Sequence, residues 1–267
     1  KSKFPHEFQT DEDIVTKYEW LNHFPPQQGI IQRHFTNPQE TNPRVLQLRS
    51  KALKCFYYWT KGWSKVLEGH TGYVMSLMKL NDTTIVSGSV DRTLRVWDLT
   101  DMNNVTSLVL NGHTNAVNSV IKLNDTTIVS GSRDHTVRVW DLTNDTSRVL
   151  NGHTGSVRSV MKLNETTIVS GSYDETLRVW DLSDMNNVTS RALNGHTYVV
   201  SSVMKLNETT IVSGSWDDTL RVWDLTNDTS RVLRGHNENV HSVIKLNETT
   251  IVSGSDDYTL RVWYGVH

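Results

Sequence analysis

Histidine, serine and aspartate recur together five times along this chain, at nearly the same spacing each time. In hydrolases these residue types can cooperate, because a histidine takes the proton of a serine nucleophile while an aspartate orients the imidazole ring. Acyl transfer is therefore the first chemistry to consider. The candidate sets are His70, Ser87 and Asp91; His113, Ser130 and Asp134; His153, Ser170 and Asp174; His196, Ser213 and Asp217; and His236, Ser253 and Asp257.

Repetition weighs against a catalytic role for these sets. A catalytic site needs one nucleophile with an oxyanion hole and a substrate pocket, and none of the five sets stands out from the others. A device that stabilises a repeat is needed in every repeat, and buried polar groups must be paired. We therefore predict that the protein is not an enzyme, and we assign no catalytic residue, metal site or cofactor.

The elements that must position these residues are visible in the third repeat. VRSVMK (157–162), TTIVSGS (166–172), TLRVWDL (176–182) and SRALNG (190–195) read as four short strands divided by polar turns. Gly-His pairs, the last of them Gly235-His236, recur along the chain at spacings of 43, 40, 43 and 40 residues. Periods of 40 to 45 residues are typical of propeller blades, which cover one another's apolar faces.

The GH, SGSxD and VWD elements, present in five copies, resemble those of the WD-repeat (WD40) β-propeller family over residues 64–267. The resemblance implies an all-β fold, a WD40 β-propeller of five four-stranded blades. It also implies that each His, Ser and Asp set forms a structural tetrad with a tryptophan of the same blade. These tryptophans are Trp97, Trp140, Trp180, Trp223 and Trp263.

The last repeat ends at TLRVWYGVH without a fourth strand, whereas SKVLEGH (64–70) matches the SRVLNGH of other repeats. We predict that residues 64–68 form the strand that completes the last blade and closes the ring, which removes an open sheet edge. A ring closed between chains remains the alternative.

Variation among the repeats is concentrated in two columns. The residue before the turn Asp and the residue after the first strand's opening Val both change from repeat to repeat, while the flanking frame is copied. In a propeller these two positions open on the same side, so we predict one variable upper face. The columns comprise Val90, Arg133, Tyr173, Trp216 and Asp256, and Met75, Asn118, Arg158, Ser201 and His241.

Arg, Tyr and Trp are the residue types that dominate binding hot spots, and they cluster on three successive repeats. Arg133 and Arg158 could hold a carboxylate or phosphate, with Tyr173 adding a hydroxyl donor. Neutral drift at permissive surface positions is the competing interpretation. The predicted partner-binding residues are Arg133, Arg158, Tyr173, Trp216, Asn118, Ser201, His241 and Tyr73.

Residues 1–63 form a predicted N-terminal helical arm or linker, and residues 64–267 form the predicted propeller. Helical spacing favours helices near 11–23 and from Asn42 to about residue 59, with GIIQRHF (29–35) as a shorter one. Cys55 reads as a small core residue rather than a nucleophile. All five prolines and a local excess of basic residues fall in this first part, whereas residues 64–267 carry 18 Lys and Arg against 23 Asp and Glu.

Composition restricts the partners. The chain has 267 residues, a formal charge of -2, no apolar run long enough to cross a bilayer, and no basic stripe. We expect a monomeric propeller with no nucleic acid or membrane partner, able to join a multi-protein complex. The single cysteine fits a reducing compartment, so a cytoplasmic or nuclear location is expected. Since the first residue is not Met, we expect that it is not the native start.

A second resemblance concerns function. YYWTKGWSKVLEGHTGYV is similar to the linker into the propeller of F-box/WD-repeat substrate receptors of ubiquitin ligases, although no clear F-box follows FPHEF. SGSRDHTVRVWD, GHTGSVRSV and SGSYDETLRVWD resemble the phosphodegron-reading blades of that group, which implies phosphate contacts from Arg133, Arg158 and Tyr173. Asn118 stands where another Arg would help. Three hypotheses follow: a protein-interaction scaffold with a variable upper face, a ligase substrate receptor reading an acidic or phosphorylated degron, and a structural subunit of a large assembly.

Overall fold

The structure is a computed structural model of the chain, and it describes residues 64–266. The chain divides into two units, Lys1–Leu67 and Glu68–His267. The predicted helices and Cys55 lie outside the described residues. The described range contains strands, turns and loops, and it has no helix that could span a membrane.

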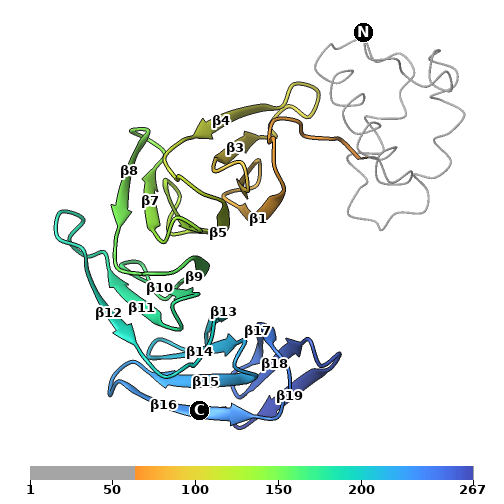
Figure 1. Cartoon of the computed structure of the whole chain (residues 1–267). Helices are drawn as coiled ribbons and strands as arrows, with labels where there is room; N and C mark the ends of the chain where they lie inside the picture. The colour runs from red at the N-terminus through yellow and green to blue at the C-terminus, as the bar shows by residue number, and fades with distance from the viewer. Residues whose placement is uncertain (1–63, 267) are drawn as a thin grey trace, which may run out of the picture. The chain divides into compact units, whose positions relative to one another are not determined.

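Within residues 64–266, nineteen strands form five antiparallel sheets in chain order (Figure 1). The first sheet comprises β1 (Val74–Lys79), β2 (Thr84–Ser89), β3 (Leu94–Asp98) and β4 (Thr106–Leu110). The second comprises β5 (Val117–Lys122), β6 (Thr127–Ser132), β7 (Val137–Asp141) and β8 (Thr146–Leu150). The third comprises β9 (Val157–Lys162), β10 (Thr167–Ser172), β11 (Leu177–Asp181) and β12 (Thr189–Leu193). The fourth comprises β13 (Val200–Lys205), β14 (Thr210–Ser215), β15 (Thr219–Asp224) and β16 (Thr229–Arg234). The fifth comprises β17 (Val240–Asn247), β18 (Thr250–Ser255) and β19 (Leu260–Tyr264).

Each sheet is a meander, and its second strand lies between the first and the third. In β10, Ile168 pairs with Lys162 of β9 and with Trp180 of β11. Ile168 and Val169 point to opposite faces, yet both are fully buried, because each face of the sheet is covered by a neighbour. Because the strands of every repeat carry apolar residues on both faces of the sheet, both faces must be covered. The prediction of an all-β fold of five sheets is confirmed.

Consecutive sheets pack through an interface that is repeated four times. Strand contacts join β1 to β5, β5 to β9, β9 to β13 and β13 to β17. At the second of these junctions, Val129 and Val137 of one sheet bury against Val157, Ile168 and Trp180 of the next. The glycine of each SGS motif admits this close approach: a Cβ at Gly131 would come within 2.5 Å of Val157.

The predicted ring closure is not observed. Residues 64–70 form no strand, and the fifth sheet has three strands with β19 at its edge. No contact comparable to those between neighbours joins the first sheet to the fifth among the described residues. The described repeats therefore comprise four four-stranded blades and one three-stranded blade.

Candidate peptide-binding surface

The five predicted tetrads are present, one in each blade. In the third blade, His153 Nδ1 lies 2.7 Å from Asp174 Oδ2, and His153 Nε2 lies 2.7 Å from Ser170 Oγ. Trp180 Nε1 donates to the same hydroxyl at 2.8 Å. The corresponding distances in the other four blades lie between 2.6 and 2.8 Å. Each tetrad ties the loop entering a blade to the turn between its second and third strands.

The turn aspartates are held ionised by their hydrogen bonds. Burial favours the neutral form of Asp134, but donors from His113, the Thr136 hydroxyl and the Thr114 backbone outweigh that effect and hold its pKa well below the usual range. The aspartates of the other four tetrads shift in the same direction. The carboxylates therefore act as acceptors that fix loops.

The tetrad serines have no open path to a substrate. Ser170 and Ser213 are fully buried, and each hydroxyl already contacts a histidine and a tryptophan. A nucleophile must reach a reacting atom, so this burial suits a structural role. Among the described residues there is also no group of three His, Cys, Asp or Glu side chains that could hold a metal ion.

The two variable columns are brought together in every blade. The backbone N–H of the residue before the turn Asp donates to the carbonyl of the residue before the opening Val, as in Tyr173 to Ser156 at 2.9 Å. The residue after the opening Val lies at a β-bulge: Val157 pairs with Ser172 and Ser159 with Gly171, so Arg158 is the extra residue. A bulge re-aims its side chain, and all five blades carry one here. The alternation of apolar and polar residues in the sequence did not predict these bulges.

Arg133 and Arg158, two of the predicted partner-binding residues, lie on adjacent blades, and Asn118 links their segments. Arg133 is exposed, and its Nε donates to Asn118 Oδ1 at 3.3 Å. The Asn118 amide in turn donates to the carbonyl of Val157 at 2.8 Å and to Ser156 Oγ at 3.2 Å. Arg158, the residue after Val157, is half-buried and makes no hydrogen bond that is resolved among the described residues. The arrangement places two guanidinium-bearing residues on neighbouring segments of one surface.

An aromatic cluster adjoins this basic region. The rings of Tyr173 and Trp216 lie 5.5 Å apart, centroid to centroid, in an edge-to-face arrangement. Tyr198 and His241 lie 6.2 and 5.9 Å from Trp216. Sequence comparison of the repeats did not single out Tyr198, which is 52% exposed and lies two residues before the opening Val200 of its blade. The Trp216 indole N–H is buried without a hydrogen-bond partner among the described residues.

A carboxylate limits the surface at the fifth blade. Asp256 Oδ1 lies 2.8 Å from His241 Nε2, and the hydrogen bonds from His241 and Asn239 lower the pKa of Asp256. The surface thus runs from the two arginines through the aromatic cluster to an acidic end. We use the name upper surface for Arg133, Arg158, Tyr173, Tyr198, Trp216, His241 and Asp256.

The structure corrects the predicted roles of two residues. Asn118 and Ser201 are buried, and the hydroxyl of Ser201 donates to the carbonyls of Gly214 and Val240. Both polar groups bridge one blade to the next, so they orient the surface rather than face a partner. Tyr73 is 82% exposed at the first blade and has no ring contact with the aromatic cluster among the described residues.

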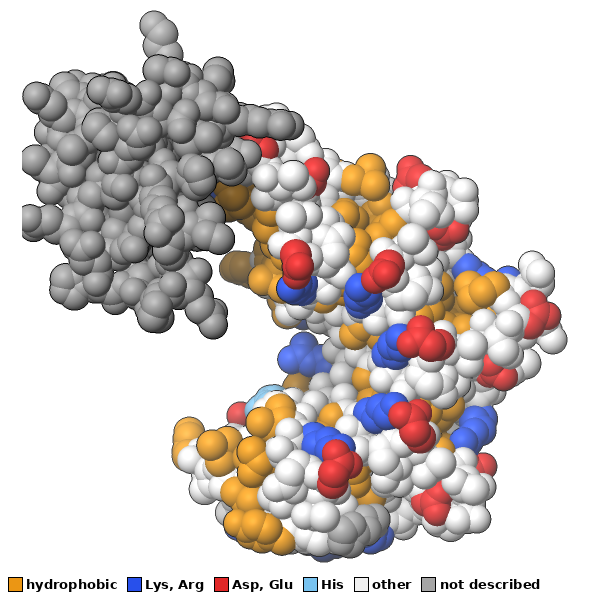
Figure 2. All heavy atoms as spheres, turned by 180° about the vertical axis from the view of Figure 1, so that it is seen from behind, with side chains coloured by type: hydrophobic (Ala, Val, Ile, Leu, Met, Phe, Trp, Pro, Cys, Tyr) orange, Lys and Arg blue, Asp and Glu red, His pale blue; other side chains and the backbone are white. Residues whose placement is uncertain are grey.

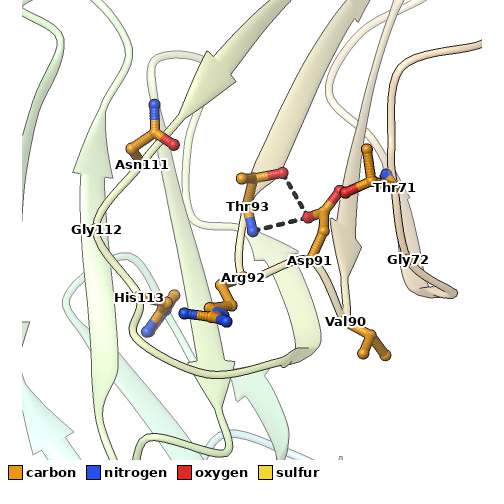
Figure 3. A pocket seen from close by; sticks show the side chains of 9 residues that line it. All are labelled: Thr71, Gly72, Val90, Asp91, Arg92, Thr93, Asn111, Gly112 and His113. Atoms are coloured by element: carbon orange, nitrogen blue, oxygen red, sulfur yellow. Dashed lines mark hydrogen bonds between the residues drawn. The ribbon is translucent and has the colours of Figure 1, made fainter.

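A shallow pocket of about 440 Å³ lies between the first and second blades (Figure 3). Thr71, Asp91, Thr93 and His113 line it, and Arg92 extends toward His113. Asp91 already accepts from the backbone N–H groups of Thr71 and Thr93 and from the Thr93 hydroxyl. Since the carboxylate oxygens of Asp91 are already hydrogen-bonded, the pocket has few polar groups left to bind a ligand. It contains none of the predicted partner-binding residues.

Comparison with known proteins identifies the family. The model of the WD domain, G-beta repeat, matches residues 63–98, 104–141, 144–181, 187–224 and 227–264. The chain therefore belongs to the WD-repeat family, as its sequence motifs indicated.

Two individual similarities add detail. A 94-residue stretch is 32% identical to cell division control protein 4 of Saccharomyces cerevisiae, and it covers 33% of this chain and 12% of that protein. The solved structure of U3-55K matches with a TM-score of 0.67 and 24% identity, over 75% of this chain and 63% of that one. The matched regions thus span only part of either protein. The likeness to U3-55K concerns the fold alone.

Proposed function

We propose that the upper surface of this protein binds an acidic or phosphorylated peptide segment of a partner protein through Arg133, Arg158 and Tyr173. The WD repeats indicate a protein-interaction scaffold, which supports this proposal. The observation that carries the proposal is the placement of both arginines on neighbouring segments linked by Asn118, beside an exposed aromatic cluster.

The charges and rings define the expected ligand. A guanidinium can bind a carboxylate or phosphate through two parallel hydrogen bonds, so the acidic group belongs over Arg133 and Arg158. Aromatic side chains provide rigid contact area, so an apolar residue of the peptide belongs over Tyr173 and Trp216. The carboxylate of Asp256 repels further acidic residues at the fifth blade. The peptide should therefore carry its negative charge at one end of the bound segment.

A phosphopeptide array, followed by fluorescence titration of the best binder, tests the proposal. Hydrogen bonds to charged groups contribute about 1.5–3 kcal/mol each, so Arg158→Ala should weaken binding by about tenfold or more. Arg148→Ala is the matched control, because Arg148 is also half-buried but lies on β8. Binding of the wild type should fall with added salt. Binding that survives Arg158→Ala undiminished would overturn the proposal.

A ligase substrate receptor is the second candidate, favoured by the match to cell division control protein 4. In that role, the upper surface selects the substrate and residues 1–63 connect the domain to the ligase. Co-purification of a cullin adaptor with the full chain, and its loss on deleting residues 1–63, would support the role. Absence of any cullin adaptor from the purified complex would contradict it.

A further inference from the structure

The two ends of the blade row expose apolar side chains whose repeat equivalents are buried everywhere else. Leu77 of the first blade is 66% exposed, whereas its equivalent in the second blade, Val120, is 4% exposed. Leu260 of the fifth blade is 76% exposed, whereas Leu220 of the fourth is fully buried. Figure 2 shows hydrophobic side chains gathered over the end formed by β17–β19. Exposed apolar patches of this kind mark interaction sites.

These ends are the two halves of one interface. At every internal junction the earlier blade contributes the equivalents of Leu246, Val252 and Leu260, and the later blade contributes the equivalents of Val74 and Leu77. Among residues 64–266, no blade packs against the first set on the fifth blade or against the second set on the first blade. The end of one molecule therefore matches the beginning of another in shape and apolar character.

The polar contacts of the junctions have the same complementarity. Lys122, Lys162, Lys205 and Lys245 each donate to a leucine carbonyl of the preceding blade, at 2.5 to 2.7 Å. Lys79 of the first blade has no such carbonyl partner among the described residues, and its side chain is 67% exposed against 28–35% for the others. The corresponding acceptor, the carbonyl of Leu246, lies at the opposite end of the row.

We propose that this protein associates with a second copy of itself, head to tail, by packing the fifth blade of one copy against the first blade of the next. In each internal junction the fourth strand of a blade leads through the Gly-His loop into the next blade. The sequence of residues 64–68 matches that of these fourth strands, so in the proposed assembly residues 64–68 of the second copy pair with β19. A contact between two different patches is heterologous and can close into a ring or continue as a chain.

Glycine provides a substitution that separates association from folding. A Cβ at Gly88, inside a junction, would come within 2.7 Å of Val117 of the next blade. At Gly254 the same atom meets only Ser242 and Leu260 of its own blade, at 3.3 and 3.4 Å. Gly254→Val therefore fits within a single copy but collides with Val74 of a second copy. By contrast, Gly88→Val should destabilise the fold itself.

Size-exclusion chromatography with light scattering on the full chain tests the proposal. The wild type should show masses above the 30.4 kDa of one chain, increasing with concentration. Gly254→Val and Leu77→Asp should each raise the apparent dissociation constant about tenfold or more. Leu108→Asp is the control, because Leu108 is 46% exposed but lies on the outer strand β4, and it should associate like the wild type.

Mixing the two end variants distinguishes head-to-tail packing from other association. Gly254→Val retains an intact first blade and Leu77→Asp an intact fifth blade, so an equimolar mixture should form a species of two chains. A wild type that stays monomeric at every concentration would overturn the proposal. A mixture that stays monomeric while the wild type associates would overturn it as well.

Discussion

The tetrad serine is the group whose removal should reveal most about the fold. Replacing Ser170 by Ala deletes a hydroxyl that accepts from Trp180 Nε1 and contacts His153 Nε2, while the rest of the side chain stays. Both partners are buried, so their polar nitrogens would be left without hydrogen bonds. An unsatisfied buried polar group costs about 1–3 kcal/mol, and two of them should lower the free energy of unfolding by about 2–4 kcal/mol after relaxation.

The fifth blade supplies an internal control for this magnitude. Trp263 is only half-buried and lies on β19, an edge strand with no fourth strand beside it, so water can replace part of the lost bond in Ser253→Ala. We expect Ser253→Ala to cost about 1–2 kcal/mol. Urea unfolding followed by far-UV circular dichroism and tryptophan fluorescence would measure the free energy of unfolding of both variants. If the two signals change at the same urea concentration, unfolding is two-state and one free energy describes it. A loss below about 0.5 kcal/mol for Ser170→Ala, or a loss no larger than that of Ser253→Ala, would refute the reasoning.

Two further predictions follow from the turns. Since hydrogen bonds lower the folded-state pKa of the five tetrad aspartates, their contribution to stability is complete above the unfolded pKa and is lost as the pH falls below about 4. The urea midpoint should drop steeply there, and a midpoint that is independent of pH from 5 to about 2.5 would contradict the assignment. Glu175 has a backbone φ of 70°, which glycine tolerates better, so Glu175→Gly should raise stability by about 0.5–1 kcal/mol in thermal unfolding, and a loss would argue against strain at this turn.

Much of the fold could be predicted because the same strand and turn sequences recur in every blade. VRSVMK was assigned to a strand at 157–162, and β9 has those bounds. The tetrads were also predictable, because polar residues copied into every apolar repeat must be paired with one another. These features depend on contacts within one blade or between neighbours, and the sequence of a single repeat contains both sides of each contact.

Ring closure could not be predicted in the same way, because it depends on the angle between blades summed over the whole row. The match of SKVLEGH to SRVLNGH predicted a strand at residues 64–68, but the structure has no strand there. The burial of Asn118 and Ser201 was missed for a related reason. At a β-bulge the alternation of inward and outward side chains is interrupted, so a variable position need not be exposed.

We propose that this scaffold meets its partner at the upper surface. Affinity purification with mass spectrometry under matched expression tests this by comparing the wild type with a variant in which Arg133, Arg158 and Tyr173 are all Ala. We expect the variant to lose a defined set of partners, while Arg148→Ala retains them. An unchanged list of partners would contradict the proposal and would direct attention to the blade edges and to residues 1–63.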